Sequence, residues 1–256
     1  MNSKPNLYVF SISHFCEKAR WALDYVGIEY QLRYLAPGSN IKLAKQLGAL
    51  RTTLPILESK VRSRSNVVQG SGLIFEWAEA NKAELSPSLN PTLDQPTEVD
   101  LSKLEKRLDD VLGFHIRRYY YSEALVDYPE IVKPLFVNKL EGKDRWKTDL
   151  FWFRIRSKMI EMMDLGPTQG LESREVLEKE LDLLDKLLVN EQPYLIGSGF
   201  SYLDITAASL LAPLIKPEEH PEYEDLLWPP RIAADCGTWQ NRPCLQWARS
   251  MYKKHR

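Results

Sequence analysis

The sequence predicts two structural classes in one chain, an α/β region with the element order βαβαββα followed by an all-α region that forms a helical bundle. Three observations support this prediction. Strand-like and helix-like hydrophobic patterns alternate as far as residue 85. A stretch with three prolines and no period, residues 86–97, follows. Beyond it the apolar patterns have helical spacing, so we expect domains at 1–85 and 98–256 joined by a linker at 86–97.

The first predicted unit is a buried strand that passes directly into a helix. Residues 7–12 form a nearly continuous apolar run, which is typical of a strand covered on both faces. Apolar residues then recur every three or four positions from Phe15 to Val26, and Gly27 is a typical helix end. Ser13 therefore lies at the helix N-terminus, where unpaired amides and the helix dipole favour an anion, with Cys16 one turn further on. The alternative is that Ser13 is only the N-cap.

The other α/β elements follow in order along the chain. Each is recognised by its period and by the turn residues that bound it. They are a strand at 29–34, a helix at 41–48 after a turn at 37–40, a strand at 52–57 with a proline at its start, a hairpin that runs through a polar loop at 58–65 to residues 67–68, and a helix that is opened by residues 69–72 and has the apolar face Leu73, Ile74, Trp77 and Ala78.

The all-α region shows three long apolar faces. They are Leu101, Leu104, Leu108, Val111, Leu112, His115 and Tyr119; then Phe151, Ile155, Met159 and Met162; and then Leu177, Leu181, Leu184 and Leu188. Ser201 and Asp204 form a capping box, for which Phe200 and Ile205 are the hydrophobic staple. Pro213 is expected to kink the helix that follows.

The composition indicates a protein without a strongly charged partner. Its 256 residues include 34 basic and 35 acidic ones, which argues against nucleic acid or an anionic membrane as the main partner. Cys16, Cys236 and Cys244 form no close pair and no metal-ligand spacing, so we expect free thiols, a reducing compartment and no metal. The N-terminus lacks a signal-peptide core, and the apolar stretch 205–215 is far shorter than the roughly 20 residues of a membrane span. We therefore expect a soluble, cytoplasmic protein.

Four local motifs together resemble the glutathione transferase superfamily. SHFCEKAR at 13–20 is similar to the C-P-[YF]-C-x-K-x-R motif of glutaredoxins and to its serine- or cysteine-led form in transferases. TLP at 53–55 resembles the cis-proline segment of the family, and QGSGLI at 69–74 resembles the start of its third helix. The capping box at 201–204 is a folding signature of its second domain. The resemblance implies a thioredoxin-like first domain that binds glutathione, a helical second domain and, by analogy, a homodimer.

The resemblance also implies roles for individual residues, with Ser13 and Cys16 as the catalytic candidates. Ser13 stands where the family has the residue that stabilises the glutathione thiolate. The hydroxyl of Ser71 and the helix amides beside it bind the γ-glutamyl carboxylate, Arg51 suits the glycine carboxylate, and the backbone before the proline pairs with the cysteinyl part. An exposed loop is the default position for His14. The implied glutathione-binding set is Phe15, Arg51, Thr53, Leu54, Pro55, Gln69, Gly70 and Ser71, and the implied second-substrate set is His14, His115 and Tyr119.

Three functions stay open on the sequence. The first is conjugation of glutathione to a hydrophobic electrophile, with Ser13 as the hydroxyl donor. The second is glutathione-dependent thiol–disulfide reduction through Cys16, although Ser13 replaces the attacking cysteine of the glutaredoxin motif and Cys16 also suits a small apolar core position. The third is a non-catalytic member of the fold that binds ligands or a partner protein. Tyr8 does not match the tyrosine-type transferases, because the matching position is Val9 and the two side chains face opposite sides of their strand.

Overall fold

The computed structural model describes residues 4–61, 64–94, 99–188 and 192–256. The chain forms two compact units, one of residues 1–89 and 133–155 and one of residues 90–132 and 156–256. The sequence places residues 133–155 in the helical region, whereas their contacts are with the first unit. Part of the predicted linker, residues 95–97, lies outside the described residues.

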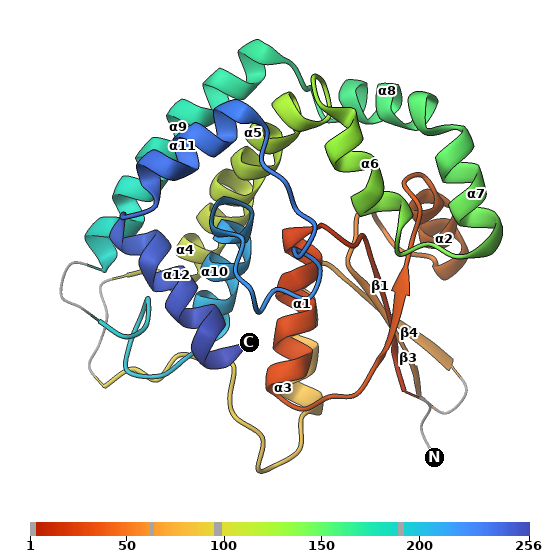
Figure 1. The fold of residues 1–256 in the computed structure, drawn as a ribbon. Coiled ribbons are helices and arrows are strands. Elements are labelled where there is room, and N and C mark those ends of the chain that lie inside the picture. Colours follow the sequence, from red (N-terminus) through yellow and green to blue (C-terminus); the bar gives the residue numbers. More distant parts are fainter. Residues whose placement is uncertain (1–3, 62–63, 95–98, 189–191) are drawn as a thin grey trace. The chain divides into compact units, whose positions relative to one another are not determined.

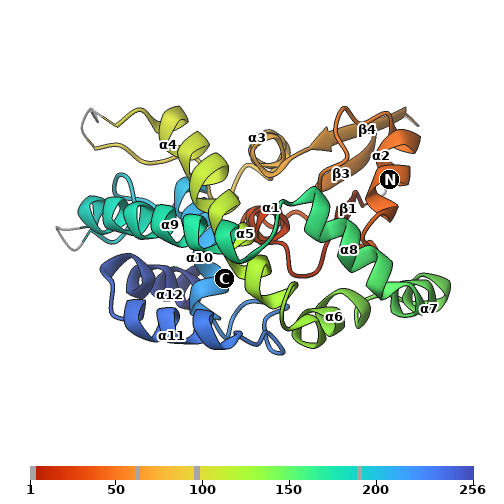
Figure 2. The same cartoon turned by 90° about the horizontal axis from the view of Figure 1, so that it is seen from above.

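The first unit is built on a four-stranded sheet with the order β2-β1-β3-β4. The strands are β1 (Asn6–Val9), β2 (Gln31–Tyr34), β3 (Ile56–Val61) and β4 (Arg64–Gln69). β1 pairs in parallel with β2 and antiparallel with β3, and β3 pairs antiparallel with β4. The helices α1 (His14–Tyr25) and α3 (Ser71–Asn81) lie on one side of the sheet and α2 (Ser39–Leu47) lies on the other (Figures 1 and 2). The predicted order βαβαββα and the thioredoxin-like arrangement are confirmed.

The hairpin of β3 and β4 is longer than the sequence predicts. The strand expected at 52–57 begins only after the proline, at Ile56, and the ladder continues to the pair of Val61 and Arg64. It therefore extends into the stretch expected to be a polar loop, of which residues 62–63 lie outside the described part of the chain. Polar side chains do not end an antiparallel ladder that has one face toward water, so hydropathy underestimates its length.

The buried face of α3 differs from the predicted one. Ile74 and Ala78 are fully buried as expected, but Phe75 is buried as well and Leu73 is exposed. Ser71, Ile74 and Ala78 follow each other at three- and four-residue steps along one helix face, and Phe75 adjoins that face. The prediction is wrong at Leu73, because the period of an apolar pattern does not by itself fix which edge of the face meets the sheet.

Residues 133–155 complete the first unit beside the turn between β1 and α1. They comprise the end of α6 (Pro129–Val137), all of α7 (Gly142–Leu150) and the start of α8 (Trp152–Met162). The Ser11 hydroxyl donates a hydrogen bond to the Leu135 carbonyl. The rings of Phe10 and Phe136 meet edge to face, with their centroids 6.4 Å apart. These contacts tie the segment to the turn that leads into α1.

The apolar face predicted from Phe151 to Met162 is right only in its middle, where Ile155 and Met159 are half-buried. α7 ends at Leu150 and α8 begins at Trp152, so Phe151 lies at the break and the other predicted residues lie on α8. Phe151 and Met162 are exposed, whereas Trp152 is buried. The spacing therefore predicts a helix here but not which side chains at its ends are buried.

The second unit is a bundle of helices around α10, which is buried along nearly its whole length. Its helical elements include α4 (Leu101–Arg107), the π-helical η1 (Leu108–Gly113), α5 (Phe114–Ala124), α9 (Pro167–Leu187), α10 (Tyr202–Ile215), α11 (Pro230–Trp239) and α12 (Pro243–His255). α5 packs along α9, and α10 packs against η1 and α12. Most side chains of the predicted faces at 101–119 and 177–188 are buried. In the described parts of the chain, no helix combines the length and the hydropathy needed to cross a membrane.

The capping box at the start of α10 is confirmed. Asp204 accepts hydrogen bonds from the Ser201 amide and hydroxyl, both at 2.8 Å, and from the Leu195 amide at 2.6 Å. Burial raises the pKa of Asp204 to about 6, although these hydrogen bonds act to lower it. Pro213 lies inside α10 as predicted, and its carbonyl accepts a hydrogen bond from the Trp228 indole at 2.7 Å. The start of α10 is thus closed by a carboxylate of the protein itself.

Candidate active site

Ser13 is the N-cap of α1, as the sequence predicts. Its carbonyl accepts hydrogen bonds from the amides of Cys16 and Glu17, each at 2.9 Å. Its hydroxyl oxygen accepts a longer bond, 3.3 Å, from the Cys16 amide. The Ser13 hydroxyl therefore lies at the positive end of the α1 dipole, just after the turn that follows β1.

Cys16 lies one turn into α1, with only 1% of its surface exposed. Burial raises the pKa of its thiol to about 11, and the charge of Glu17 acts in the same direction, while Ser13, the Phe10 backbone and Arg20 act against it. The thiol is therefore protonated near neutral pH, which weighs against a reactive, low-pKa thiol at this position. Cys16 fits the alternative of a small apolar core residue.

His14 is packed into the start of α1. It is buried, so the expectation of an exposed loop histidine is wrong, and its ring centroid lies 4.5 Å from that of Phe15. Glu17 and Lys18 of the next turn are buried as well. Polar side chains in this part of α1 are thus enclosed by the fold, a fact that their charge conceals in the sequence.

Gln69, at the end of β4, holds the segment that precedes the cis proline. The bond between Leu54 and Pro55 is cis, as the resemblance implies. The side-chain oxygen of Gln69 accepts from the Arg51 amide at 2.9 Å, and its nitrogen donates to the carbonyls of Arg51 at 2.5 Å and Thr53 at 2.9 Å. These bonds occupy both ends of the side-chain amide. Gln69 is therefore a positioning residue for this segment.

The N-terminus of α3 is not capped by any side chain in the described part of the chain. Gly70 is its N-cap residue, with φ at +98°, a conformation that favours glycine over other residues. Ser71 is the first residue of the helix and is buried. The start of α3 is therefore a positive helix end with a hydroxyl beside it, which suits a carboxylate.

The strand register brings these segments to one edge of the sheet. Tyr8, next to the end of β1, lies opposite Ile56, and Ile56 lies opposite Gln69. The turn into α1, the cis proline and the start of α3 therefore follow one another at three neighbouring strand ends. The Gly70 amide also donates a hydrogen bond to the Pro55 carbonyl at 3.0 Å. A hydroxyl, a fixed stretch of backbone and an open helix end are thus gathered at one place.

The side chains around the cis proline differ in exposure. Arg51 and Thr53 are exposed, Leu54 is half-buried and Pro55 is buried. Arg51 thus holds a guanidinium group in solvent while Gln69 fixes its backbone. Over the described residues, no group of three or more histidine, cysteine and acidic side chains is placed to hold a metal ion.

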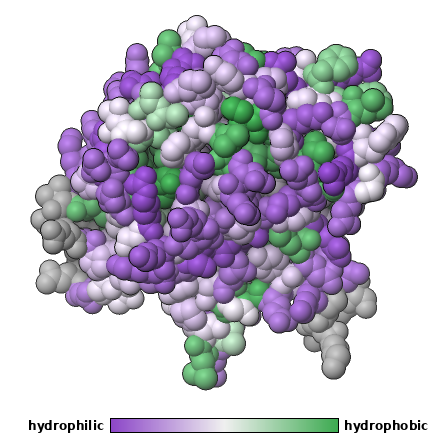
Figure 3. Space-filling view, viewed as in Figure 1, coloured by the Kyte–Doolittle hydropathy of each residue, from purple (hydrophilic) through white to green (hydrophobic). Residues whose placement is uncertain are grey.

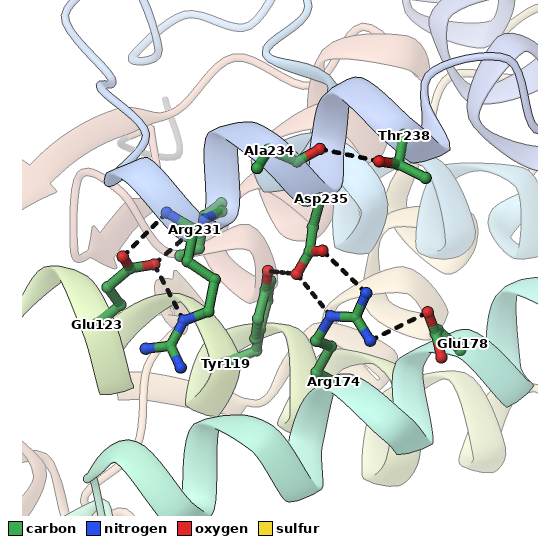
Figure 4. Close-up of polar contacts among 9 residues, drawn as sticks. Tyr119, Glu123, Arg174, Glu178, Arg231, Ala234, Asp235 and Thr238 are labelled. Carbon is green, nitrogen blue, oxygen red and sulfur yellow. Dashed lines mark hydrogen bonds and ion pairs between the residues drawn. The ribbon is translucent and has the colours of Figure 1, made fainter.

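His115 and Tyr119, the other residues predicted for the second substrate, belong to the second unit. The Tyr119 hydroxyl donates to Asp235 at 2.6 Å, and Arg174 donates to the same carboxylate at 2.7 and 2.9 Å (Figure 4). Burial alone would raise the pKa of Asp235, but these bonds outweigh it and lower the pKa. His115 Nδ1 lies 3.1 Å from the Ser173 hydroxyl, and burial lowers the pKa of the imidazole. Both side chains thus make polar contacts within the second unit.

A buried carboxylate, that of Glu123, lies near this network. Glu123 accepts hydrogen bonds from the amides of Arg231 and Ile232, at 3.0 and 3.1 Å, in the first turn of α11 (Figure 4). Its partners are more than 100 positions away in the sequence. No local motif marks such a pair, so the sequence does not reveal it.

Comparisons with known proteins agree with the fold of the first unit. Residues 7–86 match the family model of the glutathione S-transferase N-terminal domain. A comparison with curated protein sequences gave no significant match.

Solved structures show the fold of the whole chain. It is similar to beta-etherase LigF from Sphingobium sp. strain SYK-6, with 19% identity, a TM-score of 0.58 and coverage of 98% of this chain and 100% of that one. It is similar to glutathione transferase GSTFuA3 from Phanerochaete chrysosporium, with 16% identity, a TM-score of 0.64 and coverage of 100% and 98%. It is also similar to human glutathione-S-transferase T1-1 in its apo form, with 17% identity, a TM-score of 0.57 and coverage of 98% of this chain and 83% of that one. Residues 7–86 are thus a glutathione S-transferase N-terminal domain, and the whole chain has the fold of the solved glutathione transferases.

Proposed function

We propose that the protein binds glutathione at the described edge of the sheet and conjugates it to a hydrophobic electrophile. The observation that carries this proposal is the position of the Ser13 hydroxyl at the N-terminus of α1, beside the strand ends that hold Pro55 and the start of α3. Two similar structures support the choice of ligand. The glutathione S-transferase CsGST63524 of Ceriporiopsis subvermispora was solved with glutathione, and a transferase of Methylobacterium radiotolerans was solved with glutathione sulfonate.

In this proposal Ser13 stabilises the thiolate form of bound glutathione. A cysteine thiol has a pKa of about 8.5, so it is mostly protonated at pH 7. A hydroxyl donor and the positive end of a helix both favour the charged form. The thiol proton passes to solvent, the sulfur attacks an electrophilic carbon, and the leaving group departs with the electron pair of the broken bond. Ser13 donates a hydrogen bond throughout and keeps its own proton.

The other candidate residues serve to bind the tripeptide. The backbone of Leu54 pairs with the cysteinyl part, and Ser71 with the first amides of α3 binds the γ-glutamyl carboxylate. Arg51 binds the glycine carboxylate, because its guanidinium matches a carboxylate with two parallel hydrogen bonds. Gln69 acts indirectly by fixing the backbone of Arg51 and Thr53.

The burial of Cys16 weighs against the second function, thiol–disulfide reduction. Such a reaction needs a thiolate that reaches the disulfide, whereas burial raises the pKa of this thiol to about 11. The third function, ligand binding without catalysis, predicts affinity for glutathione or another ligand without turnover. It is distinguished from the proposal by experiment.

Calorimetric titration with glutathione, followed by a conjugation assay with a chlorinated dinitrobenzene, tests the proposal. We expect the wild type to bind and to turn over. Ser13→Ala should keep its affinity within about threefold, because one hydrogen bond is lost. Its kcat should fall about 100-fold, as for the loss of one donor to a reacting anion.

Ser11→Ala is the matched control, because Ser11 lies in the same turn but its hydroxyl donates to the Leu135 carbonyl. This variant should behave like the wild type. A wild type that does not bind glutathione at millimolar concentration contradicts the proposal. Binding without any turnover supports the non-catalytic alternative, and full turnover by Ser13→Ala contradicts the role of Ser13.

We further propose that the protein acts in the cytoplasm as a homodimer, in detoxification of electrophiles. Cys16, Cys236 and Cys244 are buried free thiols, which suits a reducing compartment. The dimer rests on analogy with the family. Light scattering during size-exclusion chromatography measures the mass of the protein in solution. A monomer at micromolar concentration would contradict the dimer.

A further inference from the structure

A group of exposed apolar side chains lies where α7 meets α8. Trp146, Leu150, Phe151 and Phe153 expose 62%, 55%, 42% and 65% of their surface, and we name these four residues the α7–α8 patch. Trp146 and Leu150 are four positions apart on α7 and therefore share a face. In Figure 3, viewed as in Figure 1, hydrophobic groups bordered by hydrophilic ones gather at the upper right, over α8. Single apolar residues are normal on a surface, but four within such a short segment indicate an interaction site.

Basic side chains outnumber acidic ones around the α7–α8 patch. The guanidinium of Arg154 lies over the rings of Phe151 and Phe153, 5.9 and 5.7 Å from their centroids. The segment of residues 143–154 contains two acidic residues, and one of them, Asp149, is paired with Lys133 at 2.6 Å. The segment is therefore locally positive, although the whole chain has a net charge of -1. The basic side chains between residues 143 and 154 are all exposed, and they are Lys143, Arg145, Lys147 and Arg154.

This combination distinguishes between the partners that would cover the patch. A second copy meeting it through the same face would place the cations of both copies against each other, which is unfavourable. A protein partner usually binds through side chains that fill well-packed pockets, whereas these side chains lie exposed on two short neighbouring helices beside basic residues. A lipid surface accepts exposed aromatic rings, because such side chains settle at the level of the headgroups. Anionic headgroups also attract the surrounding lysine and arginine side chains.

We propose that the α7–α8 patch binds the protein peripherally to a bilayer that contains anionic phospholipid. The rings of Trp146, Phe151 and Phe153 enter the headgroup region, and Lys143 and Lys147 contact lipid phosphates. The balanced total charge, which disfavours such a partner in the sequence, hides this local asymmetry. The contact needs no membrane-spanning helix and does not involve the proposed glutathione site, so it stands or falls separately from the proposed function.

Co-sedimentation of the full chain with lipid vesicles tests this proposal. One set of vesicles consists of phosphatidylcholine alone, and the other contains phosphatidylglycerol as well. We expect binding to the anionic vesicles that weakens as salt is added, and little binding to the neutral ones. The double variant Trp146→Ala/Phe153→Ala should lower the partition coefficient at least about tenfold, because two inserted rings are lost. The double variant Lys143→Glu/Lys147→Glu should lower it by a similar factor, because attraction becomes repulsion.

Two control variants match these changes at exposed positions outside the patch. Leu171→Ala/Leu227→Ala removes two exposed apolar side chains, and Lys179→Glu/Lys186→Glu reverses two exposed charges on α9. Both controls should bind anionic vesicles like the wild type, and circular dichroism should show all variants folded. The proposal is overturned if the wild type ignores anionic vesicles or if patch and control variants bind equally well. It is also overturned if the patch variants only abolish self-association.

Discussion

The N-termini of α10, α11 and α12 in the second unit and those of α1 and α3 in the first unit are completed in different ways. In the second unit, Asp204 accepts amide hydrogen bonds at the start of α10, Glu123 at the start of α11 and Asp185 at the start of α12. In the first unit, α1 starts with the Ser13 hydroxyl, and the described residues provide no side-chain cap for α3. The positive ends of α10, α11 and α12 are therefore neutralised from within. The ends of α1 and α3 are left to a hydroxyl and to whatever anion binds there.

This difference indicates which helix starts of the protein can bind an anion. A helix start that already holds a carboxylate repels a second one, and like charges in contact cost several kcal/mol. Leaving a helix start uncapped lowers stability by about 1 kcal/mol. In the proposed function, the two carboxylates and the thiolate of glutathione compensate for that loss on binding. The difference can be tested by adding a carboxylate at an uncapped helix start or by removing one from a capped start.

Closing the start of α3 should have the largest effect. Ser71→Asp places a carboxylate at the helix end that is proposed to bind the γ-glutamyl carboxylate, so we expect glutathione affinity to fall at least about 100-fold. Ser71→Asn is the matched control of equal size without the charge, and it should lose much less affinity. Calorimetric titration measures both variants, and equal affinities in the two would contradict the proposed role of the α3 end.

Opening the start of α10 should affect stability and not binding. Asp204→Ala leaves the Leu195 and Ser201 amides without their carboxylate acceptor, so the free energy of unfolding should fall by about 3 kcal/mol. Urea unfolding measures this change, and glutathione affinity of the folded variant should stay as in the wild type. Asp225→Ala, at an exposed position, is the control and should unfold like the wild type. A loss below about 1 kcal/mol would show that the closed end does not stabilise the bundle.

Removing the Gln69 side chain should have an intermediate effect on the open region. Gln69→Ala frees the backbone of Arg51 and Thr53, so we expect the KM for glutathione to rise about tenfold with a smaller change in kcat. Gln46→Ala, at an exposed position on α2, should leave both constants unchanged. If Gln69 instead contacts the reacting sulfur, kcat will fall while KM stays constant.

The smallest expected effect is a pH dependence next to the closed end of α10. His255 stacks on Phe200, the residue before Ser201, with ring centroids 4.0 Å apart, and burial together with Lys254 lowers the imidazole pKa. Because the folded pKa lies below the ordinary value of about 6.5, the stabilising contribution is present above that pH and is lost as pH falls through the folded pKa. The melting temperatures of wild type and His255→Gln should differ at about pH 8 and converge as the pH falls to about pH 5. A difference in melting temperature that stays constant across this range would contradict the pH-dependent contribution of His255.

Local signals in the sequence predict much of the fold. The change of period at Ser13, the TLP segment before the cis proline and the capping box at Ser201 all concern neighbouring residues, and the structure has each of them. A helix cap or a turn is decided within four or five residues, so its chemistry can be read from a short stretch. For the same reason the order of elements in the first unit follows from the sequence.

Contacts between distant residues could not be predicted in this way. The Gln69 side chain meets residues 16 to 18 positions away, and Tyr119 meets Asp235 across 116 positions. The burial of Cys16, which raises its thiol pKa, and that of His14 depend on what the fold places over them. Such features depend on tertiary packing, which periodicity does not encode.

The pKa of the thiol of bound glutathione tests the central proposal most directly. Thiolate absorbance, recorded against pH with the ligand-free protein subtracted, measures it in wild type and in Ser13→Ala. We predict a wild-type pKa at least about one unit below the free value of about 8.5, and a return toward that value in the variant. A bound thiol that titrates as in free glutathione, or the same pKa in both proteins, would contradict the role of Ser13 and of the α1 N-terminus.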